Sequence, residues 1–451
     1  MHSKIIYNHN IYNMEVKLGQ TIDYGISDME SSSYSHMKLV PLSGAQTGAE
    51  GETITFELPI QAINLSRSYL QMRVEVAAPT TATKRNWVHR GILPISAMQL
   101  FTRGGQYLCN IQERLSDYSR VVMSADTHRE ELDNGDESTT VYRTGDGQFY
   151  GPENAIADIV KDAPYFSQQV MDYGAVNTAR NIDIKFPLSL LKHTIFSINK
   201  SILFREVLVL KIRLADKGDV GFAASTDANF SPALAPEELS NVTYSNICMY
   251  VSQERNSNIV ESLNVATESE QGFNLLVPFP TLFTNIRNST YQAVSLRLNK
   301  SHGSSLKAVK HTVFTNGALN LRYNRANVDG DIVKKYYVNI NNNRLTEFDI
   351  DCQAGQYLDY QEQKKRLMDT PARNRIIYQR NWFHEDRFDD YQDKKTDLKT
   401  CDTNIMSGID LNQEIRYDFY GTETANAQHR HFSIVQGQKL LNINRNGLVL
   451  G

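Results

Sequence analysis

Residues 68–78 read SYLQMRVEVAA, and apolar and polar side chains alternate along the stretch. Successive side chains of a β-strand point to opposite faces, so one set should face a protein core and the other should face outward. The inward set is expected to be Leu70, Met72, Val74 and Val76. The outward set is then Tyr69, Gln71, Arg73 and Glu75. This stretch predicts a half-buried strand.

Two further stretches carry the same period. In ETITFELPI (52–60) the inward set is expected to be Ile54, Phe56, Leu58 and Ile60. In ILFREVLVLKIRLAD (202–216), the most hydrophobic strand of the chain, it is expected to be Leu208, Leu210, Ile212 and Leu214. Together the three strands predict the walls of one sandwich core.

Strand patterns resume after a segment rich in Gly, Ala, Ser and Pro. The later strands are short, rich in β-branched and aromatic residues, and separated by Asn, Gly and Asp turns, as expected of a second sandwich. We therefore predict an all-β protein of two tandem sandwiches with a few short inserted helices. The expected divisions are an N-terminal arm (1–50), a first sandwich (51–216), a linker (217–240), and a second sandwich that ends in a C-terminal tail (241–451).

The tetrapeptide GQYL occurs at 105–108 and again at 355–358. Each copy follows a strand pattern and precedes a helix-favouring stretch; the first of these places Ile111, Leu115 and Tyr118 at helical spacing. We interpret Gly105 and Gly355 as the turns from a strand into a helix inserted at a similar place in each sandwich. The repeat then indicates two units of similar architecture.

Composition restricts the class of function. The chain has 451 residues, 41% of them hydrophobic, which is enough for two or three packed domains. Its 47 Lys and Arg against 51 Asp and Glu give a net charge of -4 without long runs of one sign, so a sequence-specific nucleic-acid surface is not expected. The N-terminus lacks the apolar core of a signal peptide and no stretch could span a bilayer, which predicts synthesis in the cytosol.

The four cysteines, Cys109, Cys248, Cys352 and Cys401, lie far apart and lack the paired spacing of zinc or redox motifs. Free, mostly buried thiols are therefore expected. No sequence motif for a catalytic site or a nucleotide-binding loop is present. We expect no catalytic, cofactor-binding or metal-binding residues, and no enzyme activity.

Two stretches could still carry chemistry. His429-Arg430-His431 has the spacing of some metal sites, but an exposed polar turn is the favoured interpretation. The segment 382–399 carries Trp382, His384, Glu385, Asp386, Asp389 and Asp390. These side chains could form a cation or acid–base site, although the mixture of charges favours a solvated loop.

Three other stretches are weaker candidates. The acidic segment 131–139 lacks the register of a calcium loop. Lys84-Arg85 and Lys364-Lys365-Arg366 are basic but are not interleaved with the stacking aromatic residues of a nucleic-acid surface.

The strand pair 56–76, the helix-favouring segment 113–131 and the Pro-Leu segment followed by a hydrophobic strand (186–216) resemble the double jelly-roll major capsid proteins of icosahedral double-stranded DNA viruses. The similarity is closest to the virophage and polinton-like branch. VKKYYVNINNNRL (333–345) resembles a β-hairpin region of the second roll in that family.

This resemblance implies a protein of the virion whose copies form homotrimers, pseudo-hexagonal capsomers and an icosahedral capsid. It further implies contacts with penton and minor capsid proteins, and it is compatible with an internal membrane beneath the shell. Two alternatives stay open: a carbohydrate-binding or glycan-active β-sandwich that uses Tyr, Trp382 and the carboxylates near Glu385 and Asp389, and a minor virion component such as a penton or spike protein.

Overall fold

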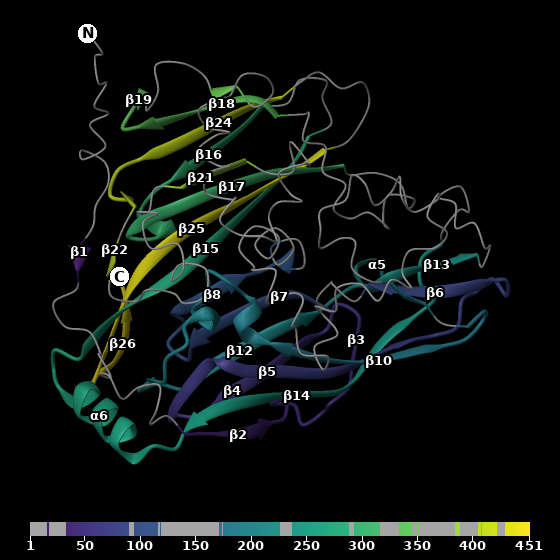
Figure 1. Cartoon of the computed structure of the whole chain (residues 1–451), viewed down its shortest axis with the longest axis horizontal. Helices are drawn as coiled ribbons and strands as arrows, with labels where there is room; N and C mark the ends of the chain where they lie inside the picture. The colour runs from purple at the N-terminus through teal and green to yellow at the C-terminus, as the bar shows by residue number, and fades with distance from the viewer. Residues whose placement is uncertain are drawn as a thin grey trace, which may run out of the picture.

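The structure is a computed structural model of the chain. The described residues are 16–17, 33–89, 94–115, 118, 171–173, 175–225, 237–287, 293–315, 333–344, 350–351, 384–387, 405–406, 408–421 and 429–451. Strands dominate them, and almost every named pair is antiparallel within one of two β-sandwiches (Figure 1).

The first sandwich consists of two facing antiparallel sheets. One sheet has the order β10 (Arg180–Pro187), β5 (Ala62–Val76), β14 (Val242–Glu254), β2 (Tyr34–Leu39); the short strands β11 (Ile202–Leu203) and β3 (Gly48–Ala49) pair with β5 and β14. The other sheet has the order β4 (Thr53–Leu58), β12 (Leu208–Leu214), β7 (Ile95–Thr102), β8 (Tyr107–Ile111).

The second sandwich is built in the same way. One sheet has the order β15 (Phe273–Arg287), β25 (His429–Asn444), β17 (Ser305–Thr315), β21 (His384–Arg387), with β23 (Ile409–Asp410) on β17 and β26 (Gly447–Leu450) on β25. The other has the order β16 (Ala293–Leu298), β24 (Ile415–Gly421), β18 (Val333–Ile340), β19 (Asn343–Arg344), with β20 (Ile350–Asp351) also on β18.

The two sandwiches share one strand order. In the first, the eight principal strands in chain order are β2, β4, β5, β7, β8, β10, β12 and β14; in the second they are β15, β16, β17, β18, β19, β21, β24 and β25. In both cases the first strand pairs with the eighth, the eighth with the third and the third with the sixth, while the second, seventh, fourth and fifth form the facing sheet. This is the jelly-roll arrangement, so the prediction of two tandem jelly rolls is confirmed.

The predicted inward side chains form the core of the first roll. The sets on β5 and β12 are at most 1% exposed, and Ile54, Phe56 and Leu58 on β4 are at most 4% exposed. Ile60 is the exception, because it is 49% exposed. Pro59 follows the last residue of β4 and cannot donate to a sheet ladder, so the strand ends before the alternation reaches Ile60.

The strand pairing differs from the expected division of the chain. Tyr34–Leu39, expected in an N-terminal arm, pairs with Val242–Glu254, which was expected in the second sandwich. Val242–Glu254 also pairs with β5, so both strands belong to the first roll. The partner of a strand depends on long-range register, which local composition does not reveal.

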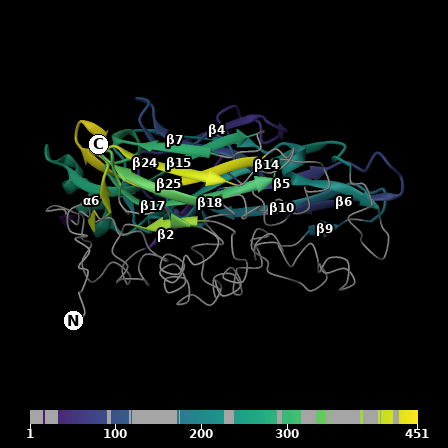
Figure 2. The ribbon, with the colours of Figure 1, turned by 90° about the horizontal axis from the view of Figure 1, so that it is seen from above.

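The expected linker also contains ordered structure. Its first residues form α5 (Lys217–Val220) and β13 (Gly221–Ser225), and β13 pairs with β6 (Lys84–His89) in a small sheet completed by β9 (Met171–Tyr173). This sheet lies at the end of the molecule opposite α6 (Ser257–Glu268) (Figures 1 and 2). In the chain, α6 follows β14, the last strand of the first roll, and precedes β15, the first strand of the second roll. Helix α6 therefore connects the two rolls.

The first GQYL copy lies in a β-hairpin. Gly105, with φ of 88°, is in the turn between β7 and β8, and Tyr107 and Leu108 already belong to β8. The expected turn into a helix is wrong here, because Ile111 is the last residue of β8. Residues 355–358 lie outside the described residues. They follow β20 in the chain, whereas the first copy separates the fourth and fifth strands of its roll, so the duplication is supported by the strand order and not by this tetrapeptide.

Two segments of the second roll that carried an expectation from the sequence are described. Residues 333–345 contain the expected hairpin of β18 and β19; Asn341 and Asn342 have φ of 49° and 64°, as a two-residue type I′ turn requires. The C-terminal segment, expected to be a tail beyond the second sandwich, instead forms β26, which pairs with β25 and buries Leu448.

Two of the four cysteines are described, and both are buried free thiols, as expected. Burial raises the pKa of Cys109 to about 12. Cys352 and Cys401 lie outside the described residues. Within the described part of the chain, no helix combines the length and the apolar character needed to cross a bilayer.

The two ends of β4 provide a matched test of the core. Ile54→Ala removes a buried side chain and should lower the free energy of unfolding by about 2–5 kcal/mol. Ile60→Ala changes an exposed side chain of the same type and should cost about 0.5 kcal/mol or less. Urea unfolding followed by fluorescence measures both; equal losses for the two variants would show that this alternation does not define the core.

Candidate functional site at the junction of the two rolls

In the sheet β15–β25–β17–β21 of the second roll, strand β25 has buried side chains on both faces. Phe432 and Ile434 on β25 belong to the large hydrophobic cluster of the first roll. Val435, the next residue, belongs to the separate cluster inside the second roll. Because neighbouring side chains of a strand point to opposite faces, β25 connects the two cores and makes the rolls one packed body.

Helix α6 connects the rolls and is docked on the first one. Ile259 and Leu263 pack with Ala62 and Leu203 in a small cluster of buried apolar residues. The helix begins after Asn256, whose side chain accepts a hydrogen bond from the backbone N–H of Asn258 at 3.0 Å. This cap supplies a partner for one of the free donors of the first turn.

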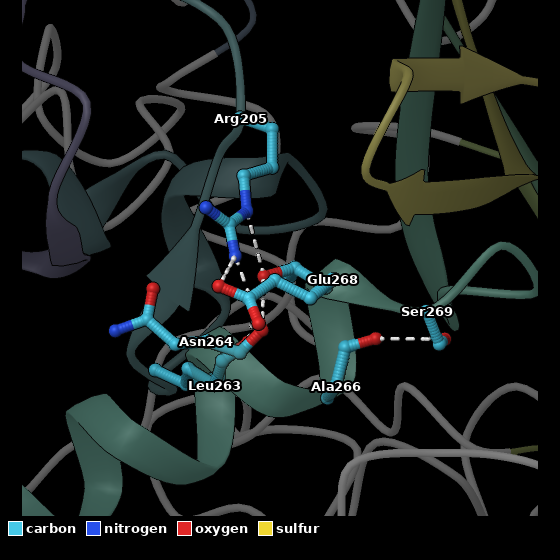
Figure 3. Close-up of polar contacts among 7 residues, drawn as sticks. Arg205, Leu263, Asn264, Ala266, Glu268 and Ser269 are labelled. Carbon is cyan, nitrogen blue, oxygen red and sulfur yellow. Dashed lines mark hydrogen bonds and ion pairs between the residues drawn. The ribbon is translucent and has the colours of Figure 1, made fainter.

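Arg205, from the loop between β11 and β12, holds the last turn of α6 (Figure 3). Its Nε donates to the Thr267 hydroxyl at 2.8 Å and one terminal nitrogen donates to the Asn264 carbonyl at 3.1 Å. The same nitrogen lies 3.7 Å from the Glu268 carboxylate. A cation at a helix C-terminus is favoured by the helix dipole, so Arg205 fixes the end of α6, the helix that leads into the second roll.

Glu206, the neighbour of Arg205, contacts the other end of the second roll. Its carboxylate accepts a hydrogen bond from the backbone N–H of Leu448 at 3.1 Å. Gly447 has φ of 121°, and a Cβ at that position would collide with the same carboxylate. One loop of the first roll therefore contacts α6 and the hairpin of β25 and β26 together.

Further polar contacts close this end of the molecule, where α6 and the C-terminus lie together (Figures 1 and 2). Arg445 in the β25–β26 turn forms an ion pair with Glu270, just after α6. The Asn442 amide donates to the Gln271 carbonyl and to the Asn274 side chain, each at 2.9 Å. The Arg445 pair is largely exposed, so it contributes little compared with the Arg205 contacts.

The outward face of the first roll carries a tyrosine pair. Tyr69 on β5 and Tyr250 on β14 are register partners, and their rings stack with centroids 4.7 Å apart. Beside them, Arg73 and Asp183 form an exposed two-bond ion pair, with nitrogen–oxygen distances of 2.7 and 3.0 Å. Hydrogen bonding to Arg73 lowers the pKa of Asp183.

The second roll has a comparable outward face. The hydroxyl oxygens of Tyr337 and Tyr420 lie 2.9 Å apart, and this hydrogen bond raises the pKa of Tyr337. The Arg344 guanidinium lies 4.3 Å from the centre of the Tyr337 ring. Asp418 accepts hydrogen bonds from Ser295 and Arg416, which raises the pKa of Arg416. These faces are therefore occupied by internal polar and aromatic contacts.

The structure brings together two stretches that the sequence left far apart. His431 is not in an exposed turn as expected: it lies on β25 and is 2% exposed. His384, Glu385 and Asp386 lie on β21, which is a strand and not the expected loop. His311 on β17, which no sequence motif marks, separates them in the sheet and its Nε2 lies 3.3 Å from Nδ1 of His431.

The other residues that the sequence suggested as functional do not lie near these histidines or lie outside the described residues. Lys84, on β6 of the small sheet, forms an ion pair with Glu237 at 2.8 Å, so it serves local structure. Trp382, Asp389, Asp390, the acidic segment 131–139 and Lys364-Lys365-Arg366 lie outside the described residues. Among the side chains that the structure describes, no three His, Cys, Asp or Glu residues form a group able to hold a metal ion.

Arg205 and Glu206 were not identified as functional from the sequence. The available signal was their position, since two adjacent charges interrupt the most apolar stretch of the chain between Leu203 and Leu208. Such a break indicates that the strand is interrupted, but it does not name the partners, which come from residues about 60 and 240 positions further along the chain.

Comparison with family models and with curated proteins finds no match. Solved structures do match. The Faustovirus major capsid protein gives a TM-score of 0.55 at 9% sequence identity, covering 92% of this chain and 91% of that chain. PBCV-1 VP54, fitted into a cryo-EM reconstruction of the virophage Sputnik, gives 0.54 at 8% identity, covering 93% of this chain and 96% of that chain. The quasi-atomic model of the PBCV-1 virus capsid gives the same values. At these identities the shared property is the fold, along nearly the whole chain.

The contacts at the junction predict that Arg205 contributes more to the stability of the protein than Arg445. Arg205→Ala removes charged hydrogen bonds from a side chain that is only 24% exposed and should lower the free energy of unfolding by about 1.5–3 kcal/mol. It should also increase amide hydrogen exchange in the last turn of α6. Arg445→Ala, at the same end of the molecule but 54% exposed, should cost less than about 1 kcal/mol.

Urea unfolding and hydrogen exchange by mass spectrometry measure the two effects. Arg205→Lys keeps the charge but loses the forked geometry, so it should recover only part of the stability. Full recovery by Lys, or equal effects of the two alanine variants, would contradict the specific role of the Arg205 side chain.

Proposed function

We propose that this protein is a major capsid protein whose copies assemble into the shell of an icosahedral virus. The observation that carries the proposal is the likeness of fold to capsid proteins over 92–93% of the chain. The likeness includes both rolls, so it concerns the tandem arrangement as well as the single sandwich. The role is structural, and its working surfaces are contacts between copies.

The junction supports an assembly role on physical grounds. A chain that contributes two similar bodies to a shell must hold them in a fixed relation, because a variable angle between them would prevent regular packing. Here β25 packs apolar side chains into the cores of both rolls, and Arg205 and Glu206 form hydrogen bonds with α6 and with the β25–β26 hairpin. These contacts fix the relation between the two rolls. Paired strand edges within each roll leave fewer edges open to irregular aggregation.

The proposed unit is a homotrimer. Closed cyclic symmetry is the usual outcome of association between identical chains. Three copies would place six jelly rolls around one axis, which gives a pseudo-hexagonal capsomer that can tile a shell. Penton and minor capsid proteins, and a membrane beneath the shell, are further partners that this proposal accommodates, and the virion is the corresponding location.

The carbohydrate-binding alternative gains no specific support. The outward tyrosines that would stack on a sugar ring are stacked on each other in the first roll and covered by Arg344 in the second. The net charge of -4 fits a shell in which other components contact the genome.

Light scattering coupled to size-exclusion chromatography tests the proposal. The purified chain should elute with a mass about three times 51.3 kDa, and negative-stain images should show particles with a hexagonal outline. A glycan array on the same sample should show no binding. A monodisperse monomer at every salt and calcium concentration tried would contradict the proposal, and selective glycan binding by that monomer would support the alternative.

A further inference from the structure

The junction inside each chain uses a different face of each roll. The second roll contributes its first and eighth strands, β15 and β25, whose apolar side chains belong to the large hydrophobic cluster of the first roll. The first roll contributes its fifth strand, β8, which lies against β15. Leu108 and Cys109 are neighbours on β8 and both are 0% exposed, so both faces of that strand are covered. The junction is therefore a contact between unlike faces of two similar bodies.

The counterparts of these two faces carry exposed side chains. In the first roll, the first and eighth strands are β2 and β14, and His36 and Lys38 on β2 are exposed. In the second roll, the fifth strand is β19, and its two residues, Asn343 and Arg344, are both exposed. Each chain therefore presents to solvent a counterpart of each half of its own junction.

A contact between unlike faces can be repeated from one copy to the next. In that case the second roll of one copy meets the first roll of the next copy in the way that the two rolls meet within a chain. Such head-to-tail contacts close into a ring where the rotation allows it and otherwise extend into a filament. A homotrimer closes the ring with six rolls, and every counterpart face is then used.

We propose that copies of this chain associate through these two faces. The outward face of β2 and β14 in one copy packs against β19 and the adjoining end of β18 in the next copy. This contact rests on the proposed function, because it takes the homotrimer as its starting point, and it identifies the surfaces that form the homotrimer. The partner is a second copy of the chain.

The first-roll face has the composition of a surface that is soluble before it is buried. The internal junction is apolar, with side chains such as Phe432 and Ile434 that are buried as the chain folds. The face of β2 and β14 instead presents the stacked rings of Tyr69 and Tyr250, and Lys38 is the register partner of Tyr250. Interfaces between separately folded partners are enriched in aromatic residues and arginine, whereas a large exposed apolar patch promotes aggregation.

The second-roll face offers a matching residue type. The guanidinium of the exposed Arg344 lies 4.3 Å from the centre of the Tyr337 ring, and the Tyr337 hydroxyl is hydrogen-bonded to that of Tyr420. Arginine stacks on aromatic rings as well as forming hydrogen bonds, so a partner face rich in tyrosine suits it. The internal contacts already hold these side chains in place, so less conformational freedom is lost on association.

Two tyrosines of the first roll provide a matched test. Tyr250→Ala removes a ring from the proposed contact and should raise the dissociation constant of the trimer about tenfold or more, as loss of an aromatic anchor does. Tyr107→Ala removes the same type of side chain, 39% exposed, from β8, which faces the chain's own second roll, and should leave the constant unchanged. Arg344→Ala alters the other half of the contact at an exposed position. It should also weaken the trimer, which keeps the test available if Tyr250→Ala impairs folding.

Sedimentation equilibrium of the whole chain measures the constants, and photo-crosslinking locates the contact. Benzoylphenylalanine in place of Arg344 should give interchain products on irradiation, and mass spectrometry should find the links in peptides that contain β2 or β14. The same group in place of Lys211, an exposed residue on β12 in the opposite sheet of the first roll, should give no interchain product.

The outcomes separate this contact from the proposed function. Trimers whose crosslinks from position 344 lie outside β2 and β14 would overturn the contact and leave the capsid role standing. Equal effects of Tyr250→Ala and Tyr107→Ala on the dissociation constant would overturn it in the same way. A wild-type chain that forms no trimer would contradict the proposed function itself, and this contact with it.

Discussion

The central constraint on this molecule is a sheet that must be buried on both faces. Strand β25 contributes Phe432 and Ile434 to the core of the first roll and Val435 to the core of the second. The strand is buried from residue 431 to residue 438, and the polar side chains of His431, Ser433, Gln436 and Gln438 are buried with it. The two rolls are thus joined through a common layer, and the loop contacts of Arg205 and Glu206 add to a junction that hydrophobic packing already defines.

Much of the fold could be predicted from local pattern. The alternation in β4, β5 and β12 correctly gave the inward face of the first roll, because a period of two leaves little choice about which side chains are buried. It failed at Ile60, where Pro59 ends the strand. The divisions of the chain were less predictable: β2 and β14 are separated by about 200 residues and become neighbours only through the jelly-roll topology.

The same reasoning applies to the stretches that the sequence suggested as sites of chemistry. The two stretches at 384–387 and 429–431 could be picked out by residue type, but His311 carried no signal, because one histidine in a strand of mixed character is unremarkable in sequence. Only the order β25–β17–β21 shows that these three segments are neighbours. Conversely, the GQYL repeat was a visible sequence signal, and the strand order shows that its two copies follow different strands of their rolls.

A fixed pair of similar rolls accounts for both the internal duplication and the proposed assembly, and a map of the assembled protein would test this most directly. Cryo-EM of the particles should show rings in which first and second rolls alternate around a three-fold axis, with α6 and the β25–β26 hairpin bridging the two rolls of each copy. A ring in which each copy contributes a single body, or in which the two rolls of one chain have separated, would contradict the account.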